Sequence, residues 1–246
     1  MKLALVTGGH RRLGSSISAR LAADGWAVAI HGAHDAAPDS ALADAFARNG
    51  TRWHGFVADL GDNDAVEGLI PAVAGHFGKL PDLLVNNASR FIDDTAATAT
   101  AASLAAHHAV NVAAPVALAL ALYRAGGGGA VVNILDQRVR NPVPDQFSYG
   151  VSKGALASAT RLLAVSLAPR IRVNAVAPGL TLPTPEYDAA LMARLADAMP
   201  LGRLSPPADI ADAVVFLASA ASTTGQTLFI DGGASLKSFD RDFVYF

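Results

Sequence analysis

The stretch LALVTGGHRRLG, residues 3 to 14, decides the fold of this chain. Leu3 to Thr7 have the length and apolar character of a buried strand, and the following glycines interrupt it with a turn. Ile17 and Leu21 then recur at helical spacing before Gly25. In such a strand–turn–helix unit, backbone N–H groups and the positive end of the helix can approach a pyrophosphate. The segment therefore predicts a phosphate-binding βα unit at the start of the chain.

Beyond this unit, short β-branched runs alternate with longer Ala-rich stretches that are typical of helices. The expected strands are Leu3–Thr7, Ala27–His31, His54–Ala58, Leu83–Asn86, Ala130–Leu135, Arg172–Val176 and Thr227–Ile230. A helix is expected to begin near Ser148. This alternation predicts successive βαβ units around a parallel sheet, in one α/β domain that spans residues 1–246.

Composition narrows the class of protein. A chain of 246 residues with 52% hydrophobic and 16% charged residues can bury a large core. It has no cysteine, so disulfides, cysteine-ligated zinc and thiol chemistry are excluded and redox work needs a bound cofactor. We expect no metal site. A net charge of −2 without a Lys/Arg block argues against nucleic acid as a partner.

Targeting signals are not evident either. The N-terminus shows no signal-peptide pattern. The longest apolar run, Val112 to Tyr123, contains Pro115 and is shorter than the roughly 20 residues that a spanning helix needs. We therefore expect a cytoplasmic protein without a membrane span.

The turn departs from the G-x-G-x-x-G dinucleotide fingerprint. Gly8 and Gly14 are present, but Arg12 stands where a further glycine is expected, and Arg11 lies beside it. Two guanidiniums at a phosphate site favour a ligand with an additional anionic group. The alternative is an ordinary βα turn whose arginines are solvated.

The end of the second expected strand, HGAHD at residues 31 to 35, bears on which nicotinamide cofactor is bound. NAD-binding proteins usually place an acid here for the ribose hydroxyls, whereas a cation suits a 2′-phosphate. Residues 31 to 34 carry no acid, so with the two arginines and His34 nearby we expect NADPH. Asp35 leaves NADH as an alternative, and His31 and His34 can equally be inert polar residues.

A second constellation joins Tyr149, Lys153, Asn111 and Asp136. The i, i+4 spacing puts Tyr149 and Lys153 on one face of a helix. A nearby ammonium is expected to lower the pKa of the tyrosine and make it a better proton donor near neutral pH. Asp136 ends the apolar run Ala130 to Leu135, which places a carboxylate near this pair.

Several motifs together resemble the short-chain dehydrogenase/reductase family, over essentially the whole chain. They are TGGHRRLG at 7–14, Asp59 in VADL, NNAS at 86–89, Asn111 in VNVAAP, YGVSK at 149–153 and RVNAVAPG at 172–179. The resemblance implies a Rossmann-type, doubly wound, seven-stranded parallel sheet flanked by helices, a nicotinamide cofactor and a homotetramer or dimer. It also implies an Asn/Ser/Tyr/Lys catalytic set, but Asp136 occupies the usual Ser position and Arg12 a usual Gly position.

Within that family, the chain is similar to the pteridine reductase branch, which includes dihydromonapterin and dihydrobiopterin reductases. That branch combines an Arg-Leu-Gly turn, NNAS, an aromatic residue two positions after its Ser, and Asp in place of the catalytic Ser. The resemblance implies that Phe91 sandwiches the pterin against nicotinamide, that Ser89 and Arg12 are polar contacts near substrate and phosphate, and that Asp136 is the partner of Tyr149. His31 matches the His that follows the second strand in that branch, and Asn111 would hold a water chain behind Lys153.

The motifs and the resemblance define the candidate residues. The catalytic residues are Asp136, Tyr149, Lys153 and Asn111. The cofactor-binding residues are Gly8, Arg11, Arg12, Leu13, His31, His34, Asp59, Leu60, Asn87, Ala88, Ser89, Tyr149, Lys153, Pro178 and Gly179. The substrate-binding residues are Arg12, Ser89, Phe91, Asp136, Tyr149 and Leu180. For Phe91 the alternative is a role in the core.

The carboxylate at 136 indicates the substrate class. A ketone that accepts hydride develops an oxyanion, which a carboxylate at about 4 Å would repel by roughly 4 kcal/mol at an effective dielectric of 20. A pterin instead offers ring C=N bonds and N–H groups that an acid can accept from. If Asp136 is protonated or turned away, ketone reduction remains open.

Two further segments follow the sixth strand. Residues 181–204 contain three prolines, at 183, 185 and 200, and a short amphipathic stretch, so we expect a substrate lid, with Leu180, Leu182 and Tyr187 as candidate walls of the pocket. The aromatic tail, residues 235–246, can pack on a neighbouring subunit near its active site or cover its own core.

The sequence therefore predicts NADPH-dependent reduction of a pterin, from dihydropterin to tetrahydropterin, with hydride transfer from the cofactor and proton donation by Tyr149. The first alternative is an NADPH-dependent carbonyl reductase acting on a 3-oxoacyl or other ketone. The second is a non-catalytic NADPH-binding protein, against which the intact Tyr149, Lys153 and Asn111 argue.

Overall fold

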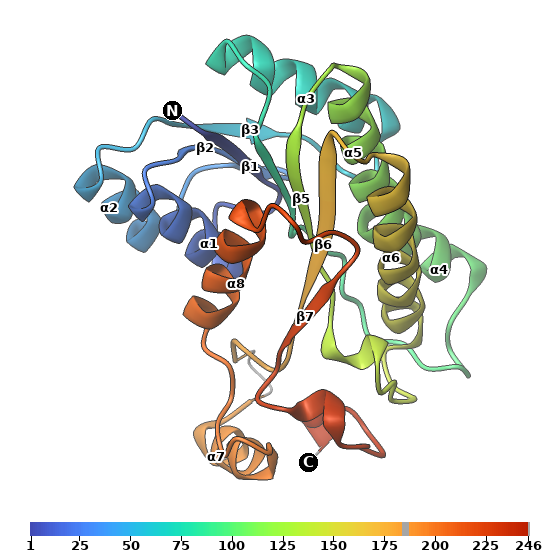
Figure 1. Ribbon diagram of the computed structural model, residues 1–246. Helices are drawn as coiled ribbons and strands as arrows, with labels where there is room; N and C mark the ends of the chain where they lie inside the picture. The colour runs from blue at the N-terminus through green and yellow to red at the C-terminus, as the bar shows by residue number, and fades with distance from the viewer. Residues whose placement is uncertain (184–186, 246) are drawn as a thin grey trace.

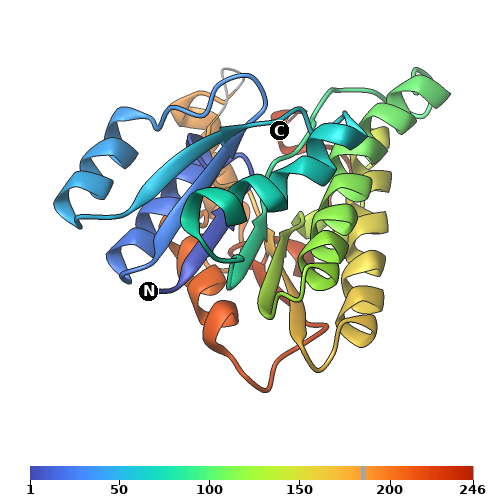
Figure 2. The ribbon, with the colours of Figure 1, turned by 90° about the horizontal axis from the view of Figure 1, so that it is seen from above.

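A seven-stranded parallel sheet lies between two layers of helices in the computed structural model, which describes residues 1–183 and 187–245 (Figures 1 and 2). The strands are β1 (Leu3–Val6), β2 (Ala27–Gly32), β3 (Trp53–Val57), β4 (Leu83–Asn86), β5 (Gly129–Ile134), β6 (Ile171–Pro178) and β7 (Thr227–Ile230). All seven expected strands are confirmed, with ends that differ by one or two residues. β1 and β4 are entirely buried, as expected for central strands that are covered on both faces.

The strand order is β3-β2-β1-β4-β5-β6-β7, which is that of a doubly wound Rossmann-type sheet and confirms the predicted fold class. The order reverses between β1 and β4, which pair in parallel from Ala4 with Leu83 to Val6 with Val85. In open α/β sheets, ligands bind beyond the carboxyl ends of the strands at such a switch point. The phosphate turn follows β1, and the NNAS motif begins with the last residue of β4, so both lie at this crevice.

The helices form a layer on each face of the sheet (Figure 1). The helical elements are α1 (Arg12–Ala23), α2 (Ser40–Arg48), α3 (Asn63–Phe77), α4 (Ala101–His108), η1 (Ala109–Ala113), α5 (Ala114–Arg124), η2 (Gln137–Val139), α6 (Phe147–Ser166), α7 (Ala189–Ala198), α8 (Pro207–Ser219), η3 (Ala234–Leu236) and η4 (Phe243–Tyr245). One hydrophobic core joins the sheet to α1, α2 and α8, and a second joins it to α3, α5 and α6.

One helical stretch, Ala101–Arg124, is long and apolar enough to cross a membrane by length and composition alone, with a mean hydropathy of 1.5 over its most apolar window. It is longer than the apolar run noted in the sequence because α4, η1 and α5 are continuous. Its α5 part packs Leu118, Ala119 and Leu122 into the core beside α3. The stretch thus serves as a core helix of this fold.

The C-terminal tail lies beside α7 beyond the carboxyl ends of the strands (Figure 1). Phe243 of the tail is buried in a small hydrophobic cluster with Leu191, Leu195 and Met199. Of the two alternatives for the tail, the structure shows packing on its own chain. Residues 184–186 of the expected lid lie outside the described part of the chain, and the lid function itself stays a prediction.

Candidate active site

The turn after β1 begins the site. Gly8 has φ +60°, a conformation that favours glycine. A Cβ atom on Gly14 would lie 1.9 Å from the carbonyl oxygen of Gly8, so the first turn of α1 can approach the loop this closely only without a side chain. Among the described residues, the N-cap Arg11 makes no side-chain capping bond, and the first turn of α1 contains no acid. The N–H groups of this turn therefore suit an anionic ligand.

Arg12 also has a positive φ, of +54°, which explains why a glycine is expected at this position. A non-glycine residue pays about 1–2 kcal/mol for this conformation. Within residues 1–183 and 187–245, the only other such residue is Gln146, with φ +55°. Both residues line the same cavity, and strained backbone of this kind is concentrated at functional sites.

Substitution of Gly14 with alanine is expected to destabilise the protein by more than about 2 kcal/mol, because the added methyl group overlaps a backbone carbonyl that cannot easily move. It should also weaken binding of NADPH, since the α1 turn must retreat from the loop. Urea unfolding and cofactor fluorescence measure the two effects. Gly68→Ala is the matched control: Gly68 is exposed on α3 with no described atom within 4 Å of an added Cβ, so this change should leave both unchanged or slightly improve stability. Equal behaviour of the two variants would contradict this account of the turn.

His31 holds the turn in place through two hydrogen bonds. Its Nδ1 accepts from the backbone N–H of Gly8 at 3.2 Å, and its Nε2 donates to the carbonyl of Ala58 at 2.8 Å. Burial lowers the pKa of His31, which favours the neutral ring that this pattern of bonds requires. His31 is thus largely buried and fixes the loop to β2 and β3, although it also borders the cavity.

The residues after β2 bear on whether the site suits the free ribose hydroxyls of NADH or the 2′-phosphate of NADPH. His34 is exposed and lines the cavity. Asp35 is not among the residues described as lining the cavity, and its Oδ1 accepts from the backbone N–H of Ala37 at 2.9 Å. The one acid that could serve ribose hydroxyls near this position is therefore engaged in its own turn.

At the centre of the site, Tyr149 donates from its hydroxyl to Oδ2 of Asp136 at 3.0 Å. Asp136 follows β5, and Tyr149 lies in the first turn of α6. Lys153, one turn further along α6, donates from Nζ to the carbonyl of Ile134 at 2.8 Å. The three predicted catalytic side chains thus meet at the carboxyl end of β5.

The expected effect of Lys153 on Tyr149 is wrong. Burial, followed by the negative charge of Asp136, raises the pKa of Tyr149 well above its ordinary value. The Lys153 ammonium lies 5.6 Å from the centre of the phenol ring and bonds a backbone carbonyl, whereas the carboxylate contacts the hydroxyl directly. Tyr149 is therefore held as a protonated phenol.

Burial also lowers the pKa of Lys153, to about 8. Below that pH the folded protein must bury an ammonium. Between pH 8 and the ordinary lysine value the unfolded chain binds more protons than the folded one, so stability rises with pH in this window.

We expect the free energy of unfolding of the wild type, relative to Lys153→Met, to increase by about 1.4 kcal/mol per pH unit at most between pH 8 and 10. Methionine keeps an unbranched side chain in the same space without a charge. Urea unfolding of both proteins at several pH values gives the difference. A difference in the free energy of unfolding that does not change with pH would mean that Lys153 does not lose its proton in the folded state over this range.

Asn111 lies in the π-helical turn η1, a type of bulge that often occurs at functional sites. Its side-chain oxygen accepts from Ser89 Oγ at 3.2 Å and from the Arg90 N–H at 2.7 Å. Its amide donates to the Arg90 carbonyl and to Ser152 Oγ, both at 2.9 Å. All four hydrogen-bonding positions of the side chain are taken by protein, so it ties the loop after β4 to α6. The water chain that the resemblance implies stays a prediction.

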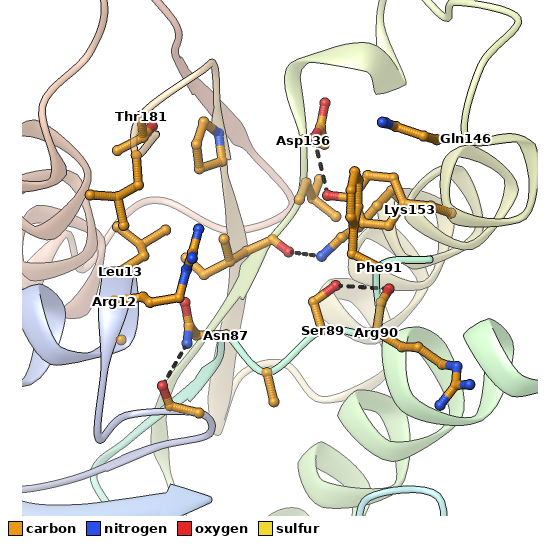
Figure 3. Close-up of a pocket in the computed structure, with 18 of the residues that line it drawn as sticks. Arg12, Leu13, Asn87, Ser89, Arg90, Phe91, Asp136, Gln146, Lys153 and Thr181 are labelled. Carbon is orange, nitrogen blue, oxygen red and sulfur yellow. Dashed lines mark hydrogen bonds between the residues drawn. The ribbon is translucent and has the colours of Figure 1, made fainter. Parts of the chain in front are cut away.

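Phe91 extends from that loop over the catalytic pair. Its ring meets the ring of Tyr149 edge to face, with centroids 4.8 Å apart, and it is 53% exposed. An exposed phenyl ring beside a tyrosine hydroxyl is available to a flat ligand, whereas a core phenylalanine would be enclosed. Phe91, Ser89 and Asp136 line the same cavity (Figure 3).

One cavity of about 1160 Å³ joins the phosphate turn to the catalytic pair. Every predicted cofactor-binding and substrate-binding residue lines it, including Leu13, Leu60, Ala88, Pro178, Gly179 and Leu180. Asp59 lines it while its carboxylate accepts from the Gly61 N–H at 2.8 Å, and Asn87 does so while bonding the carbonyls of Thr7 and Gly8. Of the catalytic set, Asn111 alone is outside the described lining.

The sequence interpretation missed a charged group at the substrate end. Arg138 and Gln146 line the cavity beside Asp136, together with Asp242 of the C-terminal tail. Arg138 could have been found from the sequence, because it follows Asp136 by two residues after the same strand. Asp242 could not, because it reaches the site only through the packing of the tail.

Comparison with known proteins agrees with this fold. Residues 9–235 match the family model described as enoyl-(acyl carrier protein) reductase. An uncharacterized oxidoreductase from Mycobacterium tuberculosis is 39% identical over 97% of this chain and 94% of that protein. The putative ketoacyl reductase 2 of the granaticin polyketide synthase from Streptomyces violaceoruber is 33% identical over 95% and 96%. The crystal structure of FolM alternative dihydrofolate reductase 1 from Brucella suis, in complex with NADP, is 38% identical over 96% of each chain with a TM-score of 0.85.

The doubly wound sheet, the glycine turn at its switch point and the Tyr149/Lys153 pair define a nicotinamide-dependent type of oxidoreductase site. With these matches, the chain belongs to the short-chain dehydrogenase/reductase family, as the motifs predicted.

Proposed function

We propose that this protein is an NADPH-dependent pterin reductase that converts a dihydropterin into a tetrahydropterin. The observation that carries the proposal is the 3.0 Å bond from the Tyr149 hydroxyl to the Asp136 carboxylate. This places a hydrogen-bond acceptor where a ketone reductase needs a donor for its oxyanion. The exposed ring of Phe91 beside it supports a flat aromatic substrate, and the similarity to FolM alternative dihydrofolate reductase 1 supports the pterin class.

The site fits NADPH. The uncapped first turn of α1 would receive the pyrophosphate, and Arg11, Arg12 and His34 would face the additional phosphate. Asp35, which would otherwise favour NADH, is engaged in its own turn. The NADP complexes of the two FolM proteins from Brucella support the same choice. When bound, NADPH supplies the hydride.

The residues of the chain supply the proton and the orientation. Phe91 would stack on the pterin ring, while Asp136 would accept from its N–H groups. Tyr149 holds its proton at physiological pH and would deliver it to the ring nitrogen of the reduced C=N bond. Lys153, whose pKa is about 8, can restore that proton at neutral pH.

The test is to follow NADPH oxidation by purified protein with dihydromonapterin, dihydrobiopterin, dihydrofolate and an acetoacetyl thioester. The proposal expects turnover of at least one dihydropterin with a kcat/KM well above that of the thioester, and a preference for NADPH over NADH. Turnover of the thioester alone would refute the pterin assignment and return the chain to carbonyl reductases, a second candidate that the 33% identity to a putative ketoacyl reductase favours.

Cytoplasmic residence and a homotetramer or dimer stay predictions. Light scattering of the purified protein tests the assembly.

A further inference from the structure

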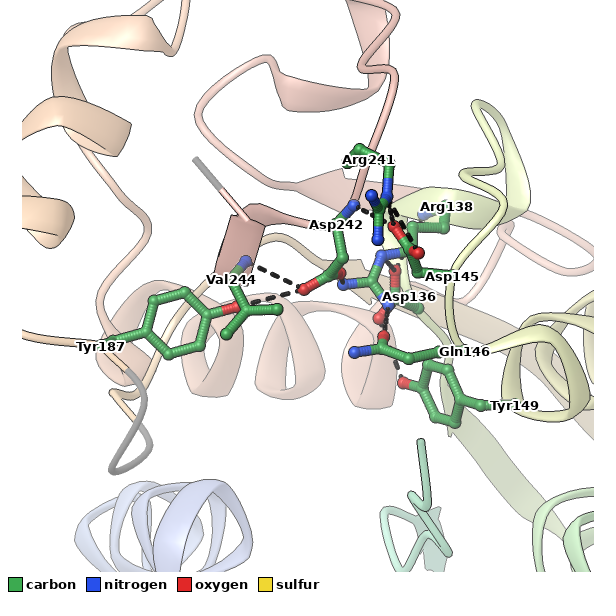
Figure 4. A network of polar contacts seen from close by, with 9 residues as sticks. All are labelled: Asp136, Arg138, Asp145, Gln146, Tyr149, Tyr187, Arg241, Asp242 and Val244. Carbon is green, nitrogen blue, oxygen red and sulfur yellow. Dashed lines mark hydrogen bonds and ion pairs between the residues drawn. The ribbon is translucent and has the colours of Figure 1, made fainter. Parts of the chain in front are cut away.

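A chain of charged side chains connects the C-terminal tail to the catalytic pair (Figure 4). Its centre is Arg138 in η2, which is largely buried. The guanidinium donates from Nη2 to a carboxylate oxygen of Asp242 and from Nη1 to the side-chain oxygen of Gln146. Its Nε lies 4.0 Å from Oδ1 of Asp136. One cation therefore bridges the tail, the residue that precedes α6, and the catalytic carboxylate.

Arg138 determines how the two oxygens of Asp136 are used. Oδ1 accepts from the backbone N–H of Arg138 at 2.9 Å and faces its guanidinium. Oδ2 remains for the Tyr149 hydroxyl at 3.0 Å. This division directs one oxygen toward the proton donor and gives the ionised carboxylate a neighbouring cation.

The tail holds Arg138 in place. The Asp242 side chain is 1% exposed, and its backbone N–H donates to Asp145 at 2.8 Å. Its other carboxylate oxygen accepts from the Val244 N–H at 3.1 Å and from the Tyr187 hydroxyl at 3.4 Å. A buried carboxylate with these fixed partners offers Arg138 a single orientation. The position of Arg138 therefore depends on how the tail is packed.

The contact between Arg138 and Asp136 matters because of the other charged groups around Asp136. Lys153 approaches from α6, but its Nζ bonds the Ile134 carbonyl. Tyr149 is a neutral phenol, and Asp242 adds a second negative charge to the group. The carboxylates of Asp136 and Asp242 outweigh the effect of burial and raise the pKa of Arg138, so the guanidinium stays charged. Among the described residues, Arg138 is the cation that lies beside Oδ1 of Asp136.

We propose that Arg138, held by Asp242 of the tail in the same chain, is a positioning residue that keeps the Asp136 carboxylate aimed at Tyr149. The C-terminal tail is thereby part of the proton-transfer apparatus of its own subunit. The inference rests on the proposed function only in taking Asp136 as the partner of Tyr149.

The first test compares Arg138→Gln, Arg138→Lys and Asp242→Asn with the wild type. Glutamine removes the cation but keeps the backbone N–H that bonds Asp136. We expect kcat to fall at least about tenfold in Arg138→Gln, partial rescue in Arg138→Lys, and a smaller fall in Asp242→Asn. The dissociation constant of NADPH should stay within about twofold, since Arg138 lies at the substrate end of the cavity. In the double variant Arg138→Gln/Asp242→Asn, kcat should fall by less than the two single falls combined, because the two residues act as a unit.

Arg241→Gln is the matched control. Arg241 lies in the same tail and pairs with Asp145 at 2.9 Å, but its side chain is 52% exposed and makes no contact with Asp136. It should keep the kcat of the wild type. An equal fall in Arg241→Gln would overturn the role of the Arg138 charge, because general loosening of the tail would then explain both results.

A second readout needs no substrate. Carbon-13 NMR of labelled aspartate carboxyls, with the Asp136 signal assigned by its loss in Asp136→Asn, reports the surroundings of that carboxylate directly. The chemical shift of the Asp136 carboxyl carbon at a fixed neutral pH should change in Arg138→Gln, which removes the adjacent guanidinium, and stay in place in Arg241→Gln. An unchanged Asp136 signal in Arg138→Gln, or a wild-type kcat in that variant, overturns the proposal. Turnover is measured with whichever substrate the wild type reduces, so a preference for the ketone would refute the pterin assignment while leaving this test in force.

Discussion

Asp136→Asn is expected to lower kcat/KM for the dihydropterin by about 100-fold, with NADPH binding unchanged. Asparagine preserves the shape of the side chain but removes its charge and one of its two acceptor oxygens. The Arg138 N–H, the Tyr149 hydroxyl and the substrate N–H groups would then compete for a single oxygen, whereas the two oxygens of Asp136 accept from Arg138 and from Tyr149 separately.

Steady-state kinetics over a range of pH checks this expectation. The negative charge of Asp136 contributes to raising the pKa of Tyr149, so the variant should also lose its proton from Tyr149 at lower pH. The alkaline fall in activity should therefore begin earlier than in the wild type. Undiminished kcat/KM in Asp136→Asn would show that the carboxylate is not required and would weaken the pterin assignment.

Tyr149→Phe is expected to lower kcat by about 10²- to 10⁴-fold, the range typical for loss of a positioned general acid. The phenyl ring keeps the edge-to-face packing against Phe91, so binding of NADPH and of the substrate should change little. Single-turnover measurement of hydride transfer with saturating NADPH isolates the chemical step.

Phe147→Tyr supplies a control for that substitution. Phe147 opens α6 two residues before Tyr149, and it is 39% exposed and absent from the described cavity lining. A hydroxyl added there should not alter kcat. Retention of more than about a tenth of the activity in Tyr149→Phe would point to another proton source, such as water.

The strands could be predicted because parallel strands covered on both faces appear in the sequence as continuous apolar runs. The candidate residues of the cavity could be predicted because glycines, amides and the Tyr149/Lys153 pair follow the carboxyl ends of those strands. The ion pair between Arg138 and Asp242 could not, because the two residues are 104 positions apart and no local pattern connects them.

The ionisation of Tyr149 was also beyond the sequence. Spacing places Lys153 on the same helix face, but it gives neither the depth of burial nor the distance to Asp136. Those two quantities decide the direction in which the pKa moves. The positive φ of Arg12 could be predicted in part. A glycine was expected at this position from the sequence, and the structure gives the reason.

The most direct test of the central claim is the ratio of kcat/KM for a dihydropterin to kcat/KM for an acetoacetyl thioester, in the wild type and in Asp136→Ser. Serine replaces the carboxylate with a hydroxyl that can donate to a developing oxyanion. If the carboxylate selects the pterin, the wild type has a high ratio, and the serine variant loses pterin activity while it gains ketone activity. A ratio that favours the thioester in the wild type, or that is the same in both proteins, would contradict the account.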